Sequence, residues 1–224
     1  SDVRATTLSQ FGFVPENSYI DTGVRPTEKT VVEMRVWVNG KYEYWFGCWD
    51  NAWNSGAFCF CNDSIGVFTA YNNQGGTAEY GSLKTIPVGV HILRLENGVF
   101  TCDGKIVASR SSGAFSLSRT LYLFGQNRAG KFTAGGNIWC DYARIYEGAE
   151  LVREYLPEYS NGQVSFRETK SDTVVLGPHE NKQIVRLDYL DAPNGAYANT
   201  EYTKNNGTAI KIGVYPTQKT LVEA

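Results

Sequence analysis

Residues 90–109 read VHILRLENGVFTCDGKIVAS, three apolar runs separated by Asn97-Gly98 and Asp103-Gly104. Asn-Gly and Asp-Gly pairs accept the positive φ angles of type I′ turns, which connect neighbouring strands through tight hairpins. The runs themselves contain Val, Ile, Phe and Thr, which are enriched in strands. The sequence therefore predicts three consecutive antiparallel strands at Val90–Glu96, Val99–Cys102 and Lys105–Ser109.

Other segments on both sides of this meander also predict short strands. In Lys29–Val38, every second residue from Val32 onward is apolar, which is the pattern of a strand with one buried face. Further strands are predicted at Tyr42–Cys48, Ser64–Ala70, Thr120–Gly125, Ile138–Tyr146 and Glu150–Leu156. No segment has convincing helical periodicity, so we predict an all-β fold, an antiparallel β-sandwich of the jelly-roll type. The residues expected between its two sheets are Val32, Met34, Val36, Ile92, Leu95, Leu121, Leu123 and Ile145.

Composition and charge limit the classes of partner. The formal net charge of -2 gives no basic face for a phosphate backbone, so no nucleic-acid partner is predicted. No apolar run approaches the roughly 18 residues that span a bilayer, so membrane insertion is not predicted either. Residues 1–7 lack the apolar core of a signal peptide, which leads us to expect a soluble chain whose leader has been removed.

The chain has five cysteines, an odd number, so at least one cannot pair within the chain. Cys59 and Cys61 lie two apart, which in a strand places them on one face and argues against a bond between them. We expect buried, reduced thiols, with one structural disulfide as the alternative. No CxxC pair exists, so zinc is not predicted. A calcium site could draw on Asp50, Asp63 or Asp141, but spaced oxygen ligands are lacking, and no metal or cofactor is predicted.

An internal repeat suggests the domain organisation. Residues 23–33, GVRPTEKTVVE, return 190 residues later as GVYPTQKTLVE, with eight of eleven positions identical. This offset is about one domain plus a linker. We predict one domain over residues 1–180, with a turn-rich boundary at Gly177–Lys182, and a linker with the opening strands of a second copy over residues 181–224. The tail, residues 183–224, is expected to add strands to the first domain or to a neighbouring molecule, which would allow strand-mediated self-association.

Several stretches resemble a known family. Ser18–Thr27, SYIDTGVRPT, resembles the opening of concanavalin A-like (laminin G-like) domains of bacterial secreted and surface proteins. Leu121–Asn127, Ala143–Gly148 and Leu151–Pro157 resemble, in order, later strands of the same family. The resemblance implies a concanavalin A-like sandwich and an extracellular or bacterial cell-surface location. It says little about a site, because these residues build the scaffold.

Catalytic patterns are weak. Glycoside hydrolysis needs two facing carboxylates, and the ExDxxE strand of the related β-glucanases is absent. Glu154 and Glu158 are predicted to be solvated edge charges. His91 falls inside a predicted strand and His179 in a predicted linker, and no GxSxG motif accompanies either. We therefore predict that the chain is not an enzyme, with a divergent glycoside hydrolase as the less favoured alternative.

Binding has better support. Residues 44–54, YWFGCWDNAWN, contain three tryptophans with short polar side chains, and sugars combine faces that stack on indole rings with hydroxyls that pair with Asp and Asn. A polar loop at residues 126–131 follows a strong strand. The predicted ligand-binding residues are Trp49, Asp50, Asn51, Trp53, Asn54, Asn127 and Arg128. The alternatives are that the tryptophans plug one end of the sandwich and that Asn127 bonds its own turn.

The predicted function is thus non-catalytic extracellular recognition, with a carbohydrate as the expected ligand. The alternative is a structural or adhesive repeat that contacts another protein. The repeated segment favours both, because linked modules gain avidity without any new contact.

Overall fold

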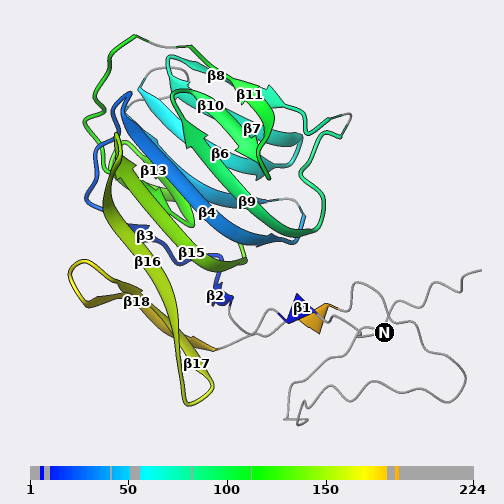
Figure 1. Ribbon diagram of the computed structural model, residues 1–224, viewed down its shortest axis with the longest axis vertical. Helices are drawn as coiled ribbons and strands as arrows, with labels where there is room; N and C mark the ends of the chain where they lie inside the picture. Colours follow the sequence, from blue (N-terminus) through cyan, green and yellow to red (C-terminus); the bar gives the residue numbers. More distant parts are fainter. Residues whose placement is uncertain are drawn as a thin grey trace, which may run out of the picture.

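The computed structural model describes residues 6–7, 11–40, 42–50, 56–81, 83–111, 113–180 and 185–186 (Figure 1). These residues form strands, turns and loops. They include no helix, and therefore none long and apolar enough to span a bilayer. The described part of the chain is all-β and resembles a β-sandwich, as the sequence predicts.

The larger sheet has the strand order β11-β10-β9-β4-β15-β16-β17-β18, with β2 joined to β15. Its strands are β2 (Gly12–Val14), β4 (Thr30–Val38), β9 (Gly89–Glu96), β10 (Val99–Cys102), β11 (Lys105–Ser109), β15 (Ile138–Glu147), β16 (Glu150–Ser160), β17 (Gln163–Glu168) and β18 (Thr173–Glu180). Every pairing in this sheet is antiparallel. In Figure 1, β17 and β18 lie at the end of the sheet away from β10 and β11.

The smaller sheet has the strand order β14-β13-β5-β6-β7-β8, with β12 pairing both β3 and β5. Its strands are β3 (Ile20–Asp21), β5 (Glu43–Trp49), β6 (Ala57–Asp63), β7 (Gly66–Asn72), β8 (Gln74–Ala78), β12 (Tyr122–Leu123), β13 (Gly125–Arg128) and β14 (Lys131–Gly135). Its pairings are antiparallel except that β13 runs parallel to β5. This parallel contact brings two distant parts of the chain together at the ends of β5 and β13.

The predicted meander is confirmed as β9, β10 and β11. Both of its turns have two consecutive residues with positive φ, 50° and 74° at Asn97-Gly98 and 50° and 76° at Asp103-Gly104. A type I′ turn requires this pair of angles. The two dipeptides therefore form the hairpins for the stereochemical reason that predicted them.

The predicted core is confirmed with one exception. Val32, Met34, Val36, Leu95, Leu121, Leu123 and Ile145 are fully buried between the sheets. Ile92 is 40 % exposed, so its prediction was wrong. Side chains alternate between the two faces of a strand, and Ile92 lies three residues from the buried Leu95. It pairs instead with Arg35 on the outer face.

All five cysteines are buried and free, as the sequence predicts. They lie in both sheets. Cys59 and Cys61 share one face of β6, with their sulfur atoms 3.9 Å apart. Each thiol therefore packs as a small core residue.

The proposed domain boundary needs one correction. Gly177–Glu180 forms the end of β18, paired with β17, rather than a turn-rich linker. His179 is therefore in a strand and not in a linker. Of the tail, the structure describes β19 (Val185–Arg186), which pairs with β1 (Thr6–Thr7) apart from the two large sheets. The second copy of the repeat, at residues 213–223, lies outside the described residues, as does the rest of the tail.

Candidate functional site

The structure brings two of the predicted binding residues together. Trp49 ends β5 and Arg128 ends β13, and these residues are direct partners in the parallel pairing. The guanidinium carbon of Arg128 lies 5.4 Å from the centroid of the Trp49 ring, within the range of a cation–π contact. Three other predicted residues, Asn51, Trp53 and Asn54, lie outside the described residues.

Asp50 and Asn127 connect the segments around this pair. The Asp50 carboxylate accepts hydrogen bonds from the backbone N–H of Ser118 (2.8 Å), the hydroxyl of Ser118 (2.8 Å) and the backbone N–H of Arg119 (2.9 Å). The side-chain amide of Asn127 donates to the Thr120 carbonyl (2.8 Å), and its oxygen accepts from the Gly130 N–H (2.9 Å). The two side chains therefore fix the end of β5, the segment 118–120 and the β13–β14 hairpin together.

Trp49 supports this end of the molecule rather than exposing its ring. It is 2 % exposed and packs in a second apolar cluster with Ala57, Cys59, Cys61 and Ala70. In β6 these residues alternate with Phe58 and Phe60 of the main core, so the second cluster lies on the outer face of the smaller sheet. For Trp49 and Asn127 the structure matches the alternatives that the sequence left open, a buried ring and a self-bonded turn.

Three cationic side chains lie at the same end of the molecule, where β5 and β13 end. They belong to Arg119, Arg128 and Lys131, and we call this group the basic end. Lys131 pairs with Arg128 across the β13–β14 hairpin. A Cβ atom added to Gly130 would lie 3.2 Å from a guanidinium nitrogen of Arg119, so that side chain lies against the hairpin tip. Arg119 and Lys131 are exposed and Arg128 is half-buried. Such a surface favours ligands that carry hydroxyl or carboxylate oxygens.

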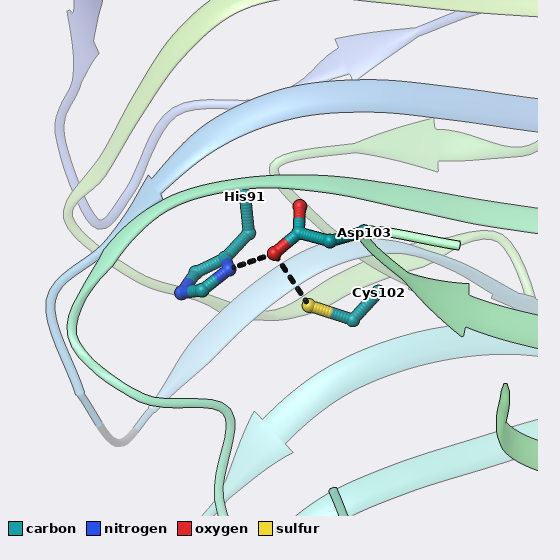
Figure 2. Close-up of side chains that lie close together, drawn as sticks. All are labelled: His91, Cys102 and Asp103. Atoms are coloured by element: carbon teal, nitrogen blue, oxygen red, sulfur yellow. Dashed lines mark hydrogen bonds and ion pairs between the residues drawn. The ribbon is translucent and has the colours of Figure 1, made fainter. Parts of the chain in front are cut away.

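A second group of chemically active side chains was missed by the sequence analysis (Figure 2). His91 lies on β9, Cys102 ends β10, and Asp103 begins the turn that follows. Figure 2 shows the Asp103 carboxylate between the imidazole and the thiol, with Oδ2 2.7 Å from His91 Nδ1 and 3.9 Å from Cys102 Sγ. The closeness of Asp103 to His91 could have been predicted from the sequence. The register set by the Asn97-Gly98 turn places Cys102 opposite Leu93, so the next residue, Asp103, comes close to His91 on the neighbouring strand.

The geometry of this group does not activate the thiol. The His91 imidazole faces a carboxylate and a carbonyl oxygen, so it is not placed to take the proton from Cys102. Burial, with the nearby Asp103 charge, raises the pKa of the Cys102 thiol to about 12. A thiol with such a pKa remains protonated near neutral pH and is a poor nucleophile.

The two acidic residues considered on β16 are each ion-paired, and Glu158 is also solvated, as predicted, since its side chain is 42 % exposed. Arg144 donates to Glu154 at 2.8 Å, and the Thr169 hydroxyl donates to the same carboxylate at 3.0 Å. Arg167 pairs with Glu158 at 2.5 Å, and this hydrogen bond lowers the pKa of Glu158. These pairs connect β16 to the neighbouring strands β15 and β17. Each carboxylate is paired with its own arginine. Glycoside hydrolysis instead requires two carboxyl groups in different roles, one as an acid and the other as a base or nucleophile.

A shallow polar cavity of about 280 Å³ lies near the turn between β17 and β18. Arg153 on its wall donates to the Thr22 carbonyl at 3.3 Å. Glu168 accepts from the backbone N–H groups of Lys170 (3.1 Å) and Ser171 (2.6 Å), and these bonds lower its pKa against the effect of burial. Its charged groups therefore already serve the local structure.

Comparisons with protein-family models, with curated proteins and with solved structures found no match. The resemblance to concanavalin A-like domains therefore remains a prediction from the motifs themselves.

Proposed function

We propose that this chain is a non-catalytic recognition module of the concanavalin A-like, jelly-roll type, located outside the cell or on a bacterial surface, and that it binds carbohydrate. The observation that supports this proposal most strongly is the construction of the basic end. Three chain segments are fixed there by Asp50 and Asn127, and they hold Arg119, Arg128 and Lys131 around one hairpin. Rigid scaffolds that present polar side chains at loop ends are typical of recognition sites.

The composition of the basic end favours a particular class of sugar. Guanidinium groups donate paired hydrogen bonds to carboxylates and to neighbouring hydroxyls, and charge-assisted bonds are about twice as strong as neutral ones. The Asp50 carboxylate is turned toward the Ser118 and Arg119 backbone. We therefore expect a glycan with a carboxylate or sulfate group, bound by Arg119, Arg128 and Lys131 above the buried Trp49.

We propose a non-catalytic module because the candidate catalytic residues are ion-paired or protonated. Glu154 and Glu158 are each paired with an arginine, and the buried Cys102 keeps its proton. None of these groups is placed as an acid–base pair or as an activated nucleophile. A divergent hydrolase therefore stays the less favoured alternative.

A glycan array that includes neutral, carboxylated and sulfated glycans tests the proposal. We expect Arg119→Ala with Lys131→Ala to weaken binding of acidic glycans by about tenfold or more, because each lost charged hydrogen bond contributes about 1.5–3 kcal/mol. The matched control is Arg25→Ala with Lys29→Ala, which removes the same two residue types from an exposed segment elsewhere. Binding that is equal in both double variants, or no binding to any glycan, would contradict the proposal.

The adhesive alternative is favoured by a different observation. β18 is the last strand of the larger sheet in the described residues, and its Val174 and Val175 are 45 % and 37 % exposed. Exposed apolar edge strands pair readily with strands of other chains. If the chain works in this way, light scattering should show association that rises with protein concentration and that Val174→Lys abolishes.

A further inference from the structure

Three potential metal ligands of three chemical types meet at the β9–β10 hairpin (Figure 2). His91 offers a ring nitrogen, Asp103 a carboxylate oxygen and Cys102 its sulfur, and these ligand atoms all lie within 4.8 Å of one another. Backbone hydrogen bonds hold the hairpin in register, since the Asp103 N–H donates to the Ile92 carbonyl at 2.8 Å. The ligand atoms are therefore brought together by a rigid element and not by a loop.

The outer contacts of these side chains orient them for a cation. His91 Nε2 lies 3.0 Å from the Pro87 carbonyl, which only accepts, so Nε2 carries a hydrogen and donates it. Asp103 Oδ1 accepts from the Ile92 N–H at 2.9 Å. Metal-binding histidines usually have this arrangement, with the second ring nitrogen donating to a carbonyl or a carboxylate. The two remaining atoms, His91 Nδ1 and Asp103 Oδ2, face each other at 2.7 Å. Both are acceptors in this arrangement, so a cation must lie between them.

That cation is a proton or a metal ion, and the role of the sulfur differs between them. With a shared proton, the Cys102 thiol donates to Asp103 Oδ2 at 3.9 Å, whereas a metal ion would bind the sulfur directly. We propose that His91, Cys102 and Asp103 form a binding site for a divalent transition-metal ion with the preference of zinc for nitrogen, sulfur and carboxylate ligands. The ion replaces the proton of the Cys102 thiol, and that proton is released to solvent as the ion binds. The Asp103 side chain is 42 % exposed, so an ion can reach the group from solvent.

The distances fit after small side-chain rotations. Tetrahedral zinc places nitrogen and oxygen ligands about 3.3 Å apart, and places sulfur about 3.5 Å from each of them. In the structure the nitrogen–oxygen distance is 2.7 Å and the sulfur–oxygen distance is 3.9 Å. An ion would therefore push the imidazole and the carboxylate apart and draw the carboxylate toward the thiol. The His91 nitrogen and the Cys102 sulfur lie within 4.8 Å of each other, and rotation of the side chains is what would bring all three ligand atoms to these spacings.

Cys59 and Cys61 form the nearest rival site, and they provide a control. Their sulfur atoms are 3.9 Å apart, and the Gln126 amide donates to the Cys59 sulfur at 3.3 Å. Among the described residues no third His, Cys, Asp or Glu ligand atom groups with these two sulfur atoms, so the pair offers fewer protein ligands than a zinc site usually has. We therefore expect no ion between these two thiols.

Titration of the reduced full chain with Co²⁺, followed by displacement with Zn²⁺, tests the site. Thiolate ligation to Co²⁺ gives a charge-transfer absorption band that nitrogen and oxygen ligands do not give. We expect this band in the wild type and in Cys59→Ser, and we expect its loss in Cys102→Ser. Zn²⁺ affinity in Cys102→Ser should fall by more than about 100-fold, because even partners outside the first ligand shell contribute about 10–100-fold.

Cys102→Ser alters a buried residue and could disturb folding, so two further variants test the same site. His91→Gln and Asp103→Asn alter more exposed side chains, and the amide introduced by Asp103→Asn retains an oxygen that can accept from the Ile92 N–H. Each should weaken Zn²⁺ binding by about tenfold or more while circular dichroism stays that of the wild type. A wild type without the thiolate band, a band that survives in Cys102→Ser, or unchanged affinity in both further variants would overturn the proposal.

Discussion

The two sheets stabilise their outer faces by different means. On the smaller sheet, Trp49 covers a second apolar cluster that includes Cys59 and Cys61. On the larger sheet, β9, β4, β15 and β16 are neighbours (Figure 1). They place four charged side chains opposite one another in a row of alternating charge, namely Arg94, Glu33, Arg144 and Glu154. One face gains stability from burial, which is non-directional, and the other gains register specificity from paired charges.

Removal of Trp49 should have the largest effect on this comparison. We expect Trp49→Ala to lower the free energy of unfolding by about 3–5 kcal/mol, because large buried aromatic side chains leave cavities when truncated. The matched variant on the larger sheet is Tyr146→Ala, whose ring is half-buried beside Arg94. Tyr146→Ala should lower the free energy of unfolding clearly less than Trp49→Ala does. Urea denaturation measures both, and equal losses would show that the two outer faces do not differ as described.

The two sheets also place a glutamate carboxylate in different surroundings. Glu33 on the larger sheet contacts Arg94 at 2.7 Å and Arg144 at 4.0 Å. Glu43 on the smaller sheet is buried and accepts from the backbone N–H groups of Asn39 (3.0 Å) and Gly40 (3.3 Å). Burial raises the pKa of Glu43 to about 7, although these hydrogen bonds oppose the rise. The protonated form of Glu43 is thus favoured by the fold.

This difference predicts a pH dependence of stability. Because the folded pKa of Glu43 lies above the unfolded value of about 4.5, its contribution is fully present below pH 4.5 and is lost as the pH rises through about 7. Glu43→Gln mimics the protonated side chain, so its stability should differ least from the wild type near pH 5 and exceed it increasingly as the pH rises through about 7, by up to about 3 kcal/mol.

Subtraction of the two pH curves isolates Glu43. Carboxylates with lowered pKa values, such as Glu28 and Glu158, change charge only in more acidic solution. The measurement is the free energy of unfolding between about pH 5 and pH 8, and parallel curves would show that the Glu43 carboxylate is not protonated preferentially in the fold.

The sequence predicted what depends on neighbours along the chain. The Asn97-Gly98 and Asp103-Gly104 turns and the alternation from Val32 to Val38 are local, and the strands formed as expected. The position of Arg128 over the Trp49 ring was not predictable in the same way, because it depends on β13 lying parallel to β5, which no local pattern encodes.

The candidate sites show the same division. Asp50 was predicted to bind a ligand, but it bonds Ser118, which lies 68 residues away in the chain. The acidic pair on β16 was expected to be solvated, yet its arginine partners come from other strands. By contrast, the approach of Asp103 to His91 follows from the register of a predicted hairpin. It was missed because zinc was considered as CxxC pairs and calcium as spaced acidic residues, and this group fits neither pattern.

The charge row on the larger sheet should give the smallest effect. The side chains of Arg94 and Glu33 are 33 % and 19 % exposed, so water and salt screen their 2.7 Å contact. We expect a double-mutant cycle with Glu33→Gln and Arg94→Met to give a coupling free energy below about 1 kcal/mol, as is usual for partly exposed pairs.

Salt concentration separates this small coupling from the effect on the smaller sheet. High salt should reduce the Glu33–Arg94 coupling toward zero, because exposed charges are screened within a few ångströms at about 1 M ionic strength. It should leave the loss caused by Trp49→Ala almost unchanged, because burial of apolar surface does not depend on charge. The cycle and the tryptophan variant are therefore measured side by side at low and high salt. A coupling that persists at high salt would mean that the charge row is buried as firmly as the apolar cluster, and the contrast between the two outer faces would then be lost.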